Sequence, residues 1–506
     1  MAQKGTKIIF IFAFLLAGLL VAAQVQAADT TASTSQASDQ VSPDPLDWFH
    51  NPAPWLEQGG DFRFREHYGY NWTTLNGELK TPPSSTRFTS GGGDNTSRWE
   101  WERYRFRLWD KFKLDDDISI NTRFTWEVRE FEEPDSAFQR TDLDEIIMDN
   151  LYLSMKNFLG LPATAKIGRQ DIMDLGQGWL VFDGTPADGS RTFYFDAARF
   201  TWDLGEKTKL DTIYISNMPK SDWWLKPIND RNKIVTQEEE QGAILYLTDK
   251  SNEKMQVEGY FMYKNNNPVD DIARNLITTP AKVAQYSKKA EIYTFGGALS
   301  GPICNDHWNY RVEGALQTGR SASPSTKVSA NTETEQLWAF GEKSTLEYSF
   351  KDDIDNKLHI TYEYLSGDDP ATKRVESFNP LWGQWPQWSE LYQPYITQLE
   401  DNLVSNMHRL DFGHKFKPNS QWEFLTDWNL LWADKNTFKN NTIAGQKAFT
   451  DDGKFRGHLF TCWAKYNFSK QLSGNLVGEY FMPGNYYAKA NNDDALYFHF
   501  TIVYTF

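Results

Sequence analysis

The chain has 506 residues, of which 15% are aromatic and 24% charged, and a formal net charge of −16 at pH 7. Such a length usually indicates two or three soluble domains, and the acidic balance argues against nucleic acid as a partner. Two cysteines, Cys304 and Cys462, are too few for a disulfide framework or a zinc site. Beyond the N-terminus, no apolar run approaches the roughly 18–20 residues that a helical membrane span requires.

The N-terminus predicts export from the cytoplasm. Lys4 and Lys7 precede an apolar stretch from Ile8 to Ala23, and Val25-Gln26-Ala27 provides small residues for cleavage. This arrangement is typical of a secretory signal peptide, here residues 1–27. A single membrane anchor is the alternative, which the shortness of the apolar stretch disfavours.

A polar segment follows the predicted cleavage site. From Ala28 to about Pro45 the chain is rich in Thr, Ser, Gln and Asp. Because this composition lacks the apolar residues needed to form a core, residues 28–57 are predicted to be a flexible periplasmic leader. Residues 58–506 are predicted to form one domain, since a single pattern repeats through them.

That pattern is an alternation of apolar and polar residues. In the final segment every second residue is apolar or aromatic: Leu496, Phe498, Phe500, Ile502, Tyr504 and Phe506. A period of two residues is typical of a β-strand with two unlike faces. The alternation recurs upstream, for example in segments 104–108, 118–129, 308–317, 358–364 and 422–432.

The connections distinguish a membrane barrel from a soluble β-sandwich, whose strands also alternate. Short links such as 115–117 and 205–207 alternate strictly with long polar links such as 71–97, 218–239 and 367–401. An up-and-down barrel with short periplasmic turns and long extracellular loops requires this alternation, whereas a Greek-key sandwich does not. The sequence therefore predicts an all-β, transmembrane antiparallel barrel of about eighteen strands in the bacterial outer membrane.

In such a barrel the apolar parity faces lipid and the polar parity faces a water-filled lumen. The inward parity carries a series of basic residues: Arg63, Arg65, Arg103, Arg105, Arg107, Arg123, Arg129, Arg199, Arg311, Arg409 and Lys415. Guanidinium groups suit carboxylates and phosphates, and rings of basic residues select anions in pores. The alternative is that these residues only pair with lumenal acids such as Glu127, Glu313 and Glu363. The net charge of −16 does not oppose an anion path, because much of the acid lies in predicted loops.

The chain resembles the alginate export porin family over nearly all of the predicted mature region. The matching stretches, in chain order, are Gly60–Glu66, Lys166–Asp171, Gly176–Trp179, Arg191–Phe193, Tyr364–Asp369, Phe378–Trp382 and Gly478–Tyr487. The resemblance implies an eighteen-stranded monomeric barrel whose arginine-rich lumen passes a polyuronate outward. It also implies outer-membrane lipids around the barrel and periplasmic export partners.

The resemblance also makes Arg169 a candidate for the pore. Ile167 and Ala165 share its parity, so strict alternation turns Arg169 toward lipid unless a bulge or a strand end intervenes. Gly168 and Gly176 provide the backbone freedom for such an irregularity.

The long loops carry two further candidates. Gly367-Asp368-Asp369-Pro370 and Asp183-Gly184 have calcium-ligand chemistry, but turn residues without a ligand cluster are usually only turns. We therefore expect no metal there. One loop also carries clustered aromatic side chains, which either stack on sugar rings at the pore mouth or pack the loop on itself as a lid: Trp382, Trp385, Trp388 and Tyr392.

Other functional classes fit less well. The eight histidines show no Ser/His/acid spacing and no metal-ligand cluster, so neither an enzyme nor a cofactor is expected. A surface adhesin or receptor is a weaker alternative, because no plug domain precedes the strands. Among pores, a conduit for an anionic polysaccharide or oligosaccharide is preferred, and a general or saccharide-uptake diffusion porin is the alternative.

Overall fold

The computed structural model describes residues 46–71, 75–76, 98–133, 146–182, 194–218, 225, 239–267, 289–323, 334–383, 386–392, 404–443 and 445–506. The chain divides into two compact units, residues 1–47 and 48–506, and the description below concerns the second. The predicted signal peptide lies outside the described residues. Among the residues described, no helix is both long enough and apolar enough to cross a membrane.

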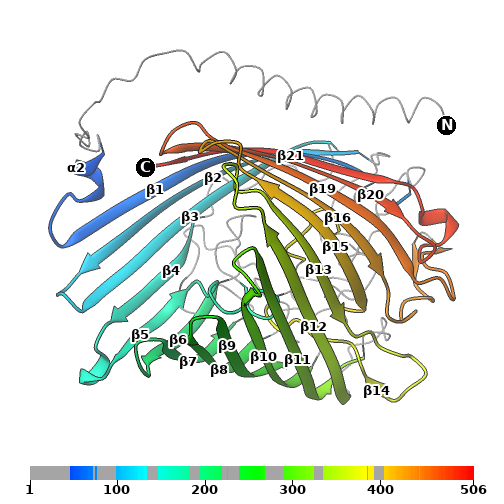
Figure 1. Ribbon diagram of the computed structural model, residues 1–506, viewed down its shortest axis with the longest axis horizontal. Helices are drawn as coiled ribbons and strands as arrows, with labels where there is room; N and C mark the ends of the chain where they lie inside the picture. Colours follow the sequence, from blue (N-terminus) through cyan, green and yellow to red (C-terminus); the bar gives the residue numbers. More distant parts are fainter. Residues whose placement is uncertain are drawn as a thin grey trace. The chain divides into compact units, whose positions relative to one another are not determined.

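Eighteen antiparallel strands form a closed barrel (Figure 1). Closure comes from β1, which pairs with β2 on one side and with the last strand, β21, on the other. The strands are β1 (Leu56–Tyr70), β2 (Arg98–Lys113), β3 (Ile118–Glu133), β4 (Ile146–Met155), β5 (Ala163–Gln170), β6 (Phe195–Asp203), β7 (Thr208–Asn217), β8 (Glu239–Asn252), β9 (Met255–Asn267), β10 (Ala290–Ile303), β11 (Trp308–Ser321), β12 (Glu335–Ser349), β13 (Lys357–Leu365), β15 (Met407–Phe416), β16 (Trp422–Trp432), β19 (Phe455–Asn467), β20 (Leu472–Pro483) and β21 (Ala495–Thr505).

The remaining elements are short. Strand β14 (Arg374–Val375) pairs with β12 in parallel, and β17 (Thr442–Ile443) forms a separate hairpin with β18 (Gln446–Lys447). Helix α2 (Asp47–His50) precedes β1, and two 3₁₀ turns, η1 (Phe158–Gly160) and η2 (Lys489–Asn491), lie in connections.

The predicted alternation of short and long connections is confirmed. Several short turns are closed by a side chain that caps the backbone: Asp115 accepts the N–H groups of Asp117 and Ile118, and Asn419 accepts that of Gln421. Another short turn follows β8, which continues to Asn252 and reverses before Met255.

The two faces of the strands differ as the alternation predicts. In β1, Phe62 is 40% exposed on the outer face, whereas Arg63 on the lumenal face is 2% exposed. Large apolar side chains such as Phe295 and Ile360 are likewise exposed outside the barrel. A closed sheet with an apolar exterior satisfies every strand's hydrogen bonds within the protein, which the hydrocarbon of a bilayer demands.

The lumen is filled at the end that carries the long connections, contrary to the expectation of a water-filled interior throughout. There the lumenal positions are apolar, as at Ile215, Ile244 and Leu337, and they pack on residues from two connections. The first inserted segment is 171–182, which follows β5. The second follows β13, and its described residues are 366–383 and 386–392. Backbone N–H groups of Trp382 and Gly383 donate to the carbonyl of Leu180, which joins the two segments.

Candidate functional site: the arginine cluster and the charged cavity

Strands β1, β2 and β3 bring the predicted arginines together. Arg63 lies opposite Arg105 and Arg65 opposite Arg103, while Arg105 lies opposite Glu127 on β3. Residues directly opposite each other in antiparallel strands project to the same face at close distance. Two arginine rows would repel each other there, so the arrangement requires carboxylates between them.

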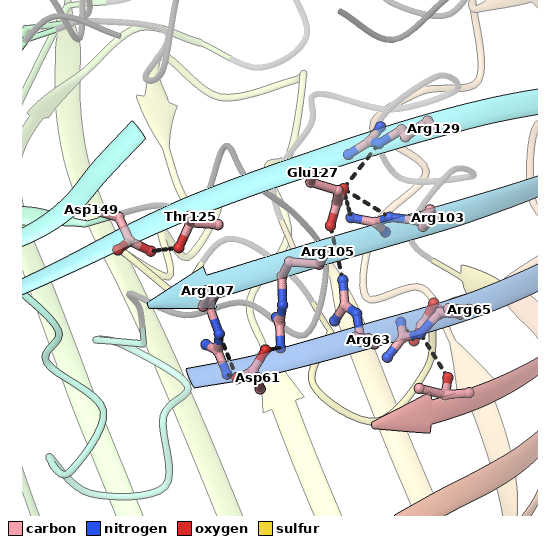
Figure 2. A network of polar contacts seen from close by, with 12 residues as sticks. Asp61, Arg63, Arg65, Arg103, Arg105, Arg107, Thr125, Glu127, Arg129 and Asp149 are labelled. Atoms are coloured by element: carbon pink, nitrogen blue, oxygen red, sulfur yellow. Dashed lines mark hydrogen bonds and ion pairs between the residues drawn. The ribbon is translucent and has the colours of Figure 1, made fainter. Parts of the chain in front are cut away.

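Glu127 is the first of these carboxylates (Figure 2). Arg63 donates to it at 2.9 Å, and Arg103 donates through two nitrogens at 3.0 and 2.8 Å. Arg129 donates at 3.4 Å from the same strand. The Glu127 side chain is only 2% exposed, so three guanidinium groups share one buried negative charge.

Asp61 is the second carboxylate. It accepts hydrogen bonds from Arg105 at 3.4 Å and from Nε of Arg107 at 2.8 Å (Figure 2). Nearby, Arg65 donates to the Thr501 hydroxyl at 2.9 Å and lies 3.4 Å from a carboxylate oxygen of Glu390. The five arginines bonded to Glu127 and Asp61 therefore share two carboxylates, and we call them the arginine cluster: Arg63, Arg103, Arg105, Arg107 and Arg129.

A cavity of about 830 Å³ adjoins this cluster on the lumenal side of strands β1 to β5. Its lining reaches residues close to the short turns, such as Lys111 and Asn121. Five basic side chains and three carboxylates line it: Arg105, Arg107, Lys111, Arg123 and Lys166, with Glu57, Asp110 and Asp171. We call it the charged cavity.

Two of the cavity's cations differ in their partners. Arg123 is held by two carboxylates, Asp149 at 2.8 Å and Asp171 at 2.8 Å. Lys166 lies over the ring of Tyr152, 5.8 Å from its centroid, and forms no ion pair with any described residue. Among the described residues, the cavity therefore contains at least one cation without a direct carboxylate partner.

The later basic candidates lie apart from the charged cavity, and each has its own acidic partners. Arg199 bonds Asp211 and Asp174, and Arg311 bonds Glu258 and Glu313. Arg409 bonds Glu363 at 2.9 Å, and Lys415 pairs with Glu423. For these residues the geometry matches the alternative interpretation, in which lumenal basic side chains only pair with lumenal carboxylates.

Arg169 is not among the residues that line the charged cavity. It lies opposite Asp196 at the end of β5 and donates to both carboxylate oxygens of that residue, at 2.9 and 3.2 Å. Its guanidinium carbon lies 3.8 Å from the ring centroid of Tyr194. Gly168 adopts φ +129°, but β5 pairs with β4 and β6 through this residue without a register shift. Arg169 therefore keeps the outward parity of Ile167 and is enclosed by these partners.

The loop aromatics do not present free faces to sugar. Trp382 is 6% exposed and Tyr392 1% exposed, and both belong to the core formed by the inserted segments. Trp388 stacks on Tyr392 and lies against Arg409. Of the two alternatives for these aromatic side chains, the geometry of Trp382, Trp388 and Tyr392 favours packing of the loop on itself over stacking on sugar rings. Trp385 lies outside the described residues.

The sequence reasoning missed one carboxylate of the arginine cluster and several residues of the charged cavity. Asp61, which bonds Arg107, shares the lumenal parity of Arg63. Trp109 and Lys111, which line the cavity, continue the parity of Arg107. Lys166 shares the parity of Gln170 on β5. Extending the period-two count to the ends of each strand would have found them.

Outside the strands, one carboxylate anchors an inserted segment. Asp174 accepts two hydrogen bonds from Arg199, at 2.7 and 2.9 Å. Burial alone would raise the pKa of Asp174, but the hydrogen bonds and the charge of Arg199 lower it below its ordinary value. The carboxylate therefore stays ionised at mildly acidic pH.

The closed antiparallel barrel with an apolar exterior and a charged lumen places this chain among the outer-membrane β-barrels of the porin type, in the bacterial outer membrane. Two solved structures are similar in fold: OccAB1 of Acinetobacter baumannii (TM-score 0.51, 11% identity, 89% of this chain and 96% of that chain) and OccAB2 of the same organism (TM-score 0.51, 11% identity, 89% and 98%). Residues 94–499 match the alginate export family, and the chain belongs to it. No curated protein matches the chain.

Proposed function

We propose that the protein passes an anionic polysaccharide or oligosaccharide, of the alginate-like polyuronate type, through its lumen. The observation that carries the proposal is the excess of basic over acidic side chains in the charged cavity, five against three. Membership of the alginate export family supports the same substrate class. The protein would act as a monomer, together with periplasmic export partners that deliver the chain.

The arrangement of the arginines suits a repeating carboxylate. Arginines on neighbouring strands converge on two shared carboxylates, and each planar guanidinium presents N–H groups that suit the carboxylate of an incoming anion. Several weak sites in a row favour conduction over tight binding, since the substrate must leave each site as readily as it enters. In a polymer with one carboxylate on every sugar, each carboxylate could move from one arginine site to the next as the chain advances.

A carboxylate from an inserted segment already occupies part of this wall. Glu390 lies 3.4 Å from Arg65 and accepts a hydrogen bond from the Tyr497 hydroxyl at 2.6 Å. It belongs to the segment after β13 and not to the barrel strands. The contact supports the view that the wall suits carboxylates presented from within the lumen.

The test is the reversal potential of single channels of the purified protein in a planar bilayer under a salt gradient, with and without an oligo-uronate. We expect preference for anions and block by the oligo-uronate. A cation-selective or unselective current that the oligo-uronate leaves unchanged would contradict the proposal and favour a general or saccharide-uptake porin.

Lys166→Gln is the cleanest variant for this measurement, because it removes a cavity cation without leaving a carboxylate unpaired. Loss of one charge-assisted contact is worth at least ~1.4 kcal/mol, so block should need a roughly tenfold higher oligo-uronate concentration. Arg320→Gln is the matched control, since Arg320 is exposed and bonds Thr334 away from the cavity. Equal block in both variants would exclude Lys166 from the path.

A further inference from the structure

Three potential metal ligands meet on the lumenal face of β13, β15 and β16. Nε2 of His359 lies 3.2 Å from Oδ2 of Asp411 and 3.4 Å from Oδ1 of Asp427. The three ligand atoms all lie within 4.8 Å of one another. This group lies apart from the charged cavity, and none of its members lines that cavity.

The strand register creates the group. Gly413 on β15 lies opposite His359 on one side and opposite Asp427 on the other. A Cβ at Gly413 would lie 2.0 Å from Cε1 of His359 and 2.4 Å from Oδ1 of Asp427. The missing side chain is therefore what allows the histidine and the aspartate to meet across the intervening strand.

The spacing of the atoms suits a small divalent ion. Ligands bound at ~2.0–2.2 Å to one ion lie roughly 3.0–3.5 Å from each other, which includes the two distances from His359. One imidazole nitrogen and two carboxylates are ligands of borderline transition metals, whereas calcium prefers oxygen alone. Two carboxylates and a neutral imidazole also balance a charge of +2.

Unsatisfied carboxylate oxygens give an independent reason to expect a cation. Oδ1 of Asp427, the oxygen that faces Nε2 of His359, is buried and accepts no hydrogen bond from any described residue. The same holds for Oδ1 of Asp411, whose other oxygen is the one that lies 3.2 Å from His359. Asp411 is 3% exposed, and a buried acceptor without a donor costs free energy. Arg409 lies 3.4 Å from the other oxygen of Asp411, but its shorter bonds are to Glu363 and Asn429.

A second cluster of similar composition differs, because a protein hydroxyl group already lies between its potential metal ligands. His67, His499 and Glu390 also approach one another, but the hydroxyl of Tyr497 lies between them. It is 2.6 Å from His67, 2.6 Å from Glu390 and 3.2 Å from His499. In the first group Nε2 of His359 itself bonds Oδ2 of Asp411 and faces Oδ1 of Asp427, and no hydrogen bond among the described residues places a fourth side chain between the three. A bound ion would therefore replace only the proton on Nε2.

We propose that His359, Asp411 and Asp427 bind one divalent transition-metal ion of the zinc class in the lumen wall. The side chains of His359 and Asp427 are 20% and 15% exposed, so the ion would be reached from the lumen. Three protein ligands leave a coordination position open for water or for a carboxylate of a solute. The proposal does not depend on the proposed substrate, and each can fail without the other.

Zinc binding to the full-length protein in detergent tests the proposal, by calorimetry and by metal content after dialysis. We expect His359→Gln and Asp427→Asn each to bind one zinc ion fewer per chain than the unaltered protein. His414→Gln is the matched control, because His414 lies on β15 next to Gly413, bonds Asn356 in the turn before β13 and belongs to no ligand group found among the described residues. It should keep the full zinc content.

Gly413→Ala removes no ligand but places a methyl group between two of them, so it should also lose the ion. Heat-modified mobility on gels would establish that each variant is folded. Cobalt substitution supplies a second readout, because visible absorption bands of a four- or five-coordinate ion should appear in the unaltered protein and be lost in His359→Gln. Equal zinc content and equal cobalt spectra in all folded variants would overturn the proposal.

Discussion

Glu127 accepts hydrogen bonds from arginines on three adjacent strands, and this explains how many like charges fit on one face of the barrel. A buried ion pair is not in itself a source of stability, because desolvation of the charges offsets their attraction. Removing one partner is different, since it leaves buried charges without compensation. The carboxylates at Glu127 and Asp61 are therefore expected to matter for folding as much as for the path.

Glu127→Gln should destabilise the folded barrel by roughly 3–5 kcal/mol, because three arginines would lose their shared carboxylate. The measurement is unfolding by denaturant in lipid vesicles. Glu347→Gln is the control: Glu347 is 36% exposed and lies 4.0 Å from Lys357, so a change within about 0.5 kcal/mol is expected. Similar decreases in the free energy of unfolding in both variants would contradict the special role of Glu127.

At the scale of elements, the segment 171–182 is held inside the barrel by a few polar anchors. Asp174 pairs with Arg199, and Nε1 of Trp179 donates to Glu313 at 2.7 Å. Trp179 also stacks on Phe378 of the second inserted segment, with ring centroids 5.4 Å apart. Polar anchors at the wall and apolar contact between the segments therefore act together.

Asp174→Asn should loosen this segment at neutral pH, seen as faster hydrogen exchange of residues 172–182 after correction for intrinsic rates. In the unaltered protein the folded pKa of Asp174 lies below its unfolded value. The Asp174–Arg199 pair then contributes its full stabilisation above the pKa of Asp174 in the unfolded chain. This stabilisation is lost as the pH falls through the pKa of Asp174 in the folded protein, below pH ~4. Loosening of the unaltered protein already at pH 6 would contradict this assignment.

At the scale of the whole molecule, the barrel encloses chain segments that fill its lumen at the end that carries the long connections. Lys264 donates to the carbonyl of Leu381 at 2.6 Å, and backbone N–H groups of Glu390 and Leu391 donate to Glu479 at 3.0 Å. These contacts come from strands on different parts of the barrel. The described residues of the second inserted segment are thus attached to several strands at once.

Replacing residues 366–406 by a short turn should raise single-channel conductance while leaving the barrel closed. The replacement is geometrically simple, because Leu365 and Met407 lie opposite each other on β13 and β15 and a hairpin can join them. Trp338→Ala on the outer face, where Trp338 is 52% exposed, is the control and should keep the original conductance. Unchanged conductance in the shortened chain would mean that the segment does not obstruct the path.

Much of the barrel could be predicted from the sequence. Alternation in segments such as 496–506, with turn residues such as Asp115 and Asn419 between them, determines strands with two unlike faces. Their number, their antiparallel order and the lumenal parity of arginines such as Arg105 follow from that local pattern. These properties depend on residues close in the chain, so no knowledge of distant contacts is needed.

Only the tertiary structure decided which lumenal residues meet. His359 and Asp427 lie together because the register places both opposite Gly413, and Trp382 is buried because its segment enters the barrel. Arg169 likewise pairs with Asp196 and lies over the ring of Tyr194 at the end of β5. Register, closure and the entry of long connections are set by contacts between residues far apart in the chain, which alternation within one strand does not encode.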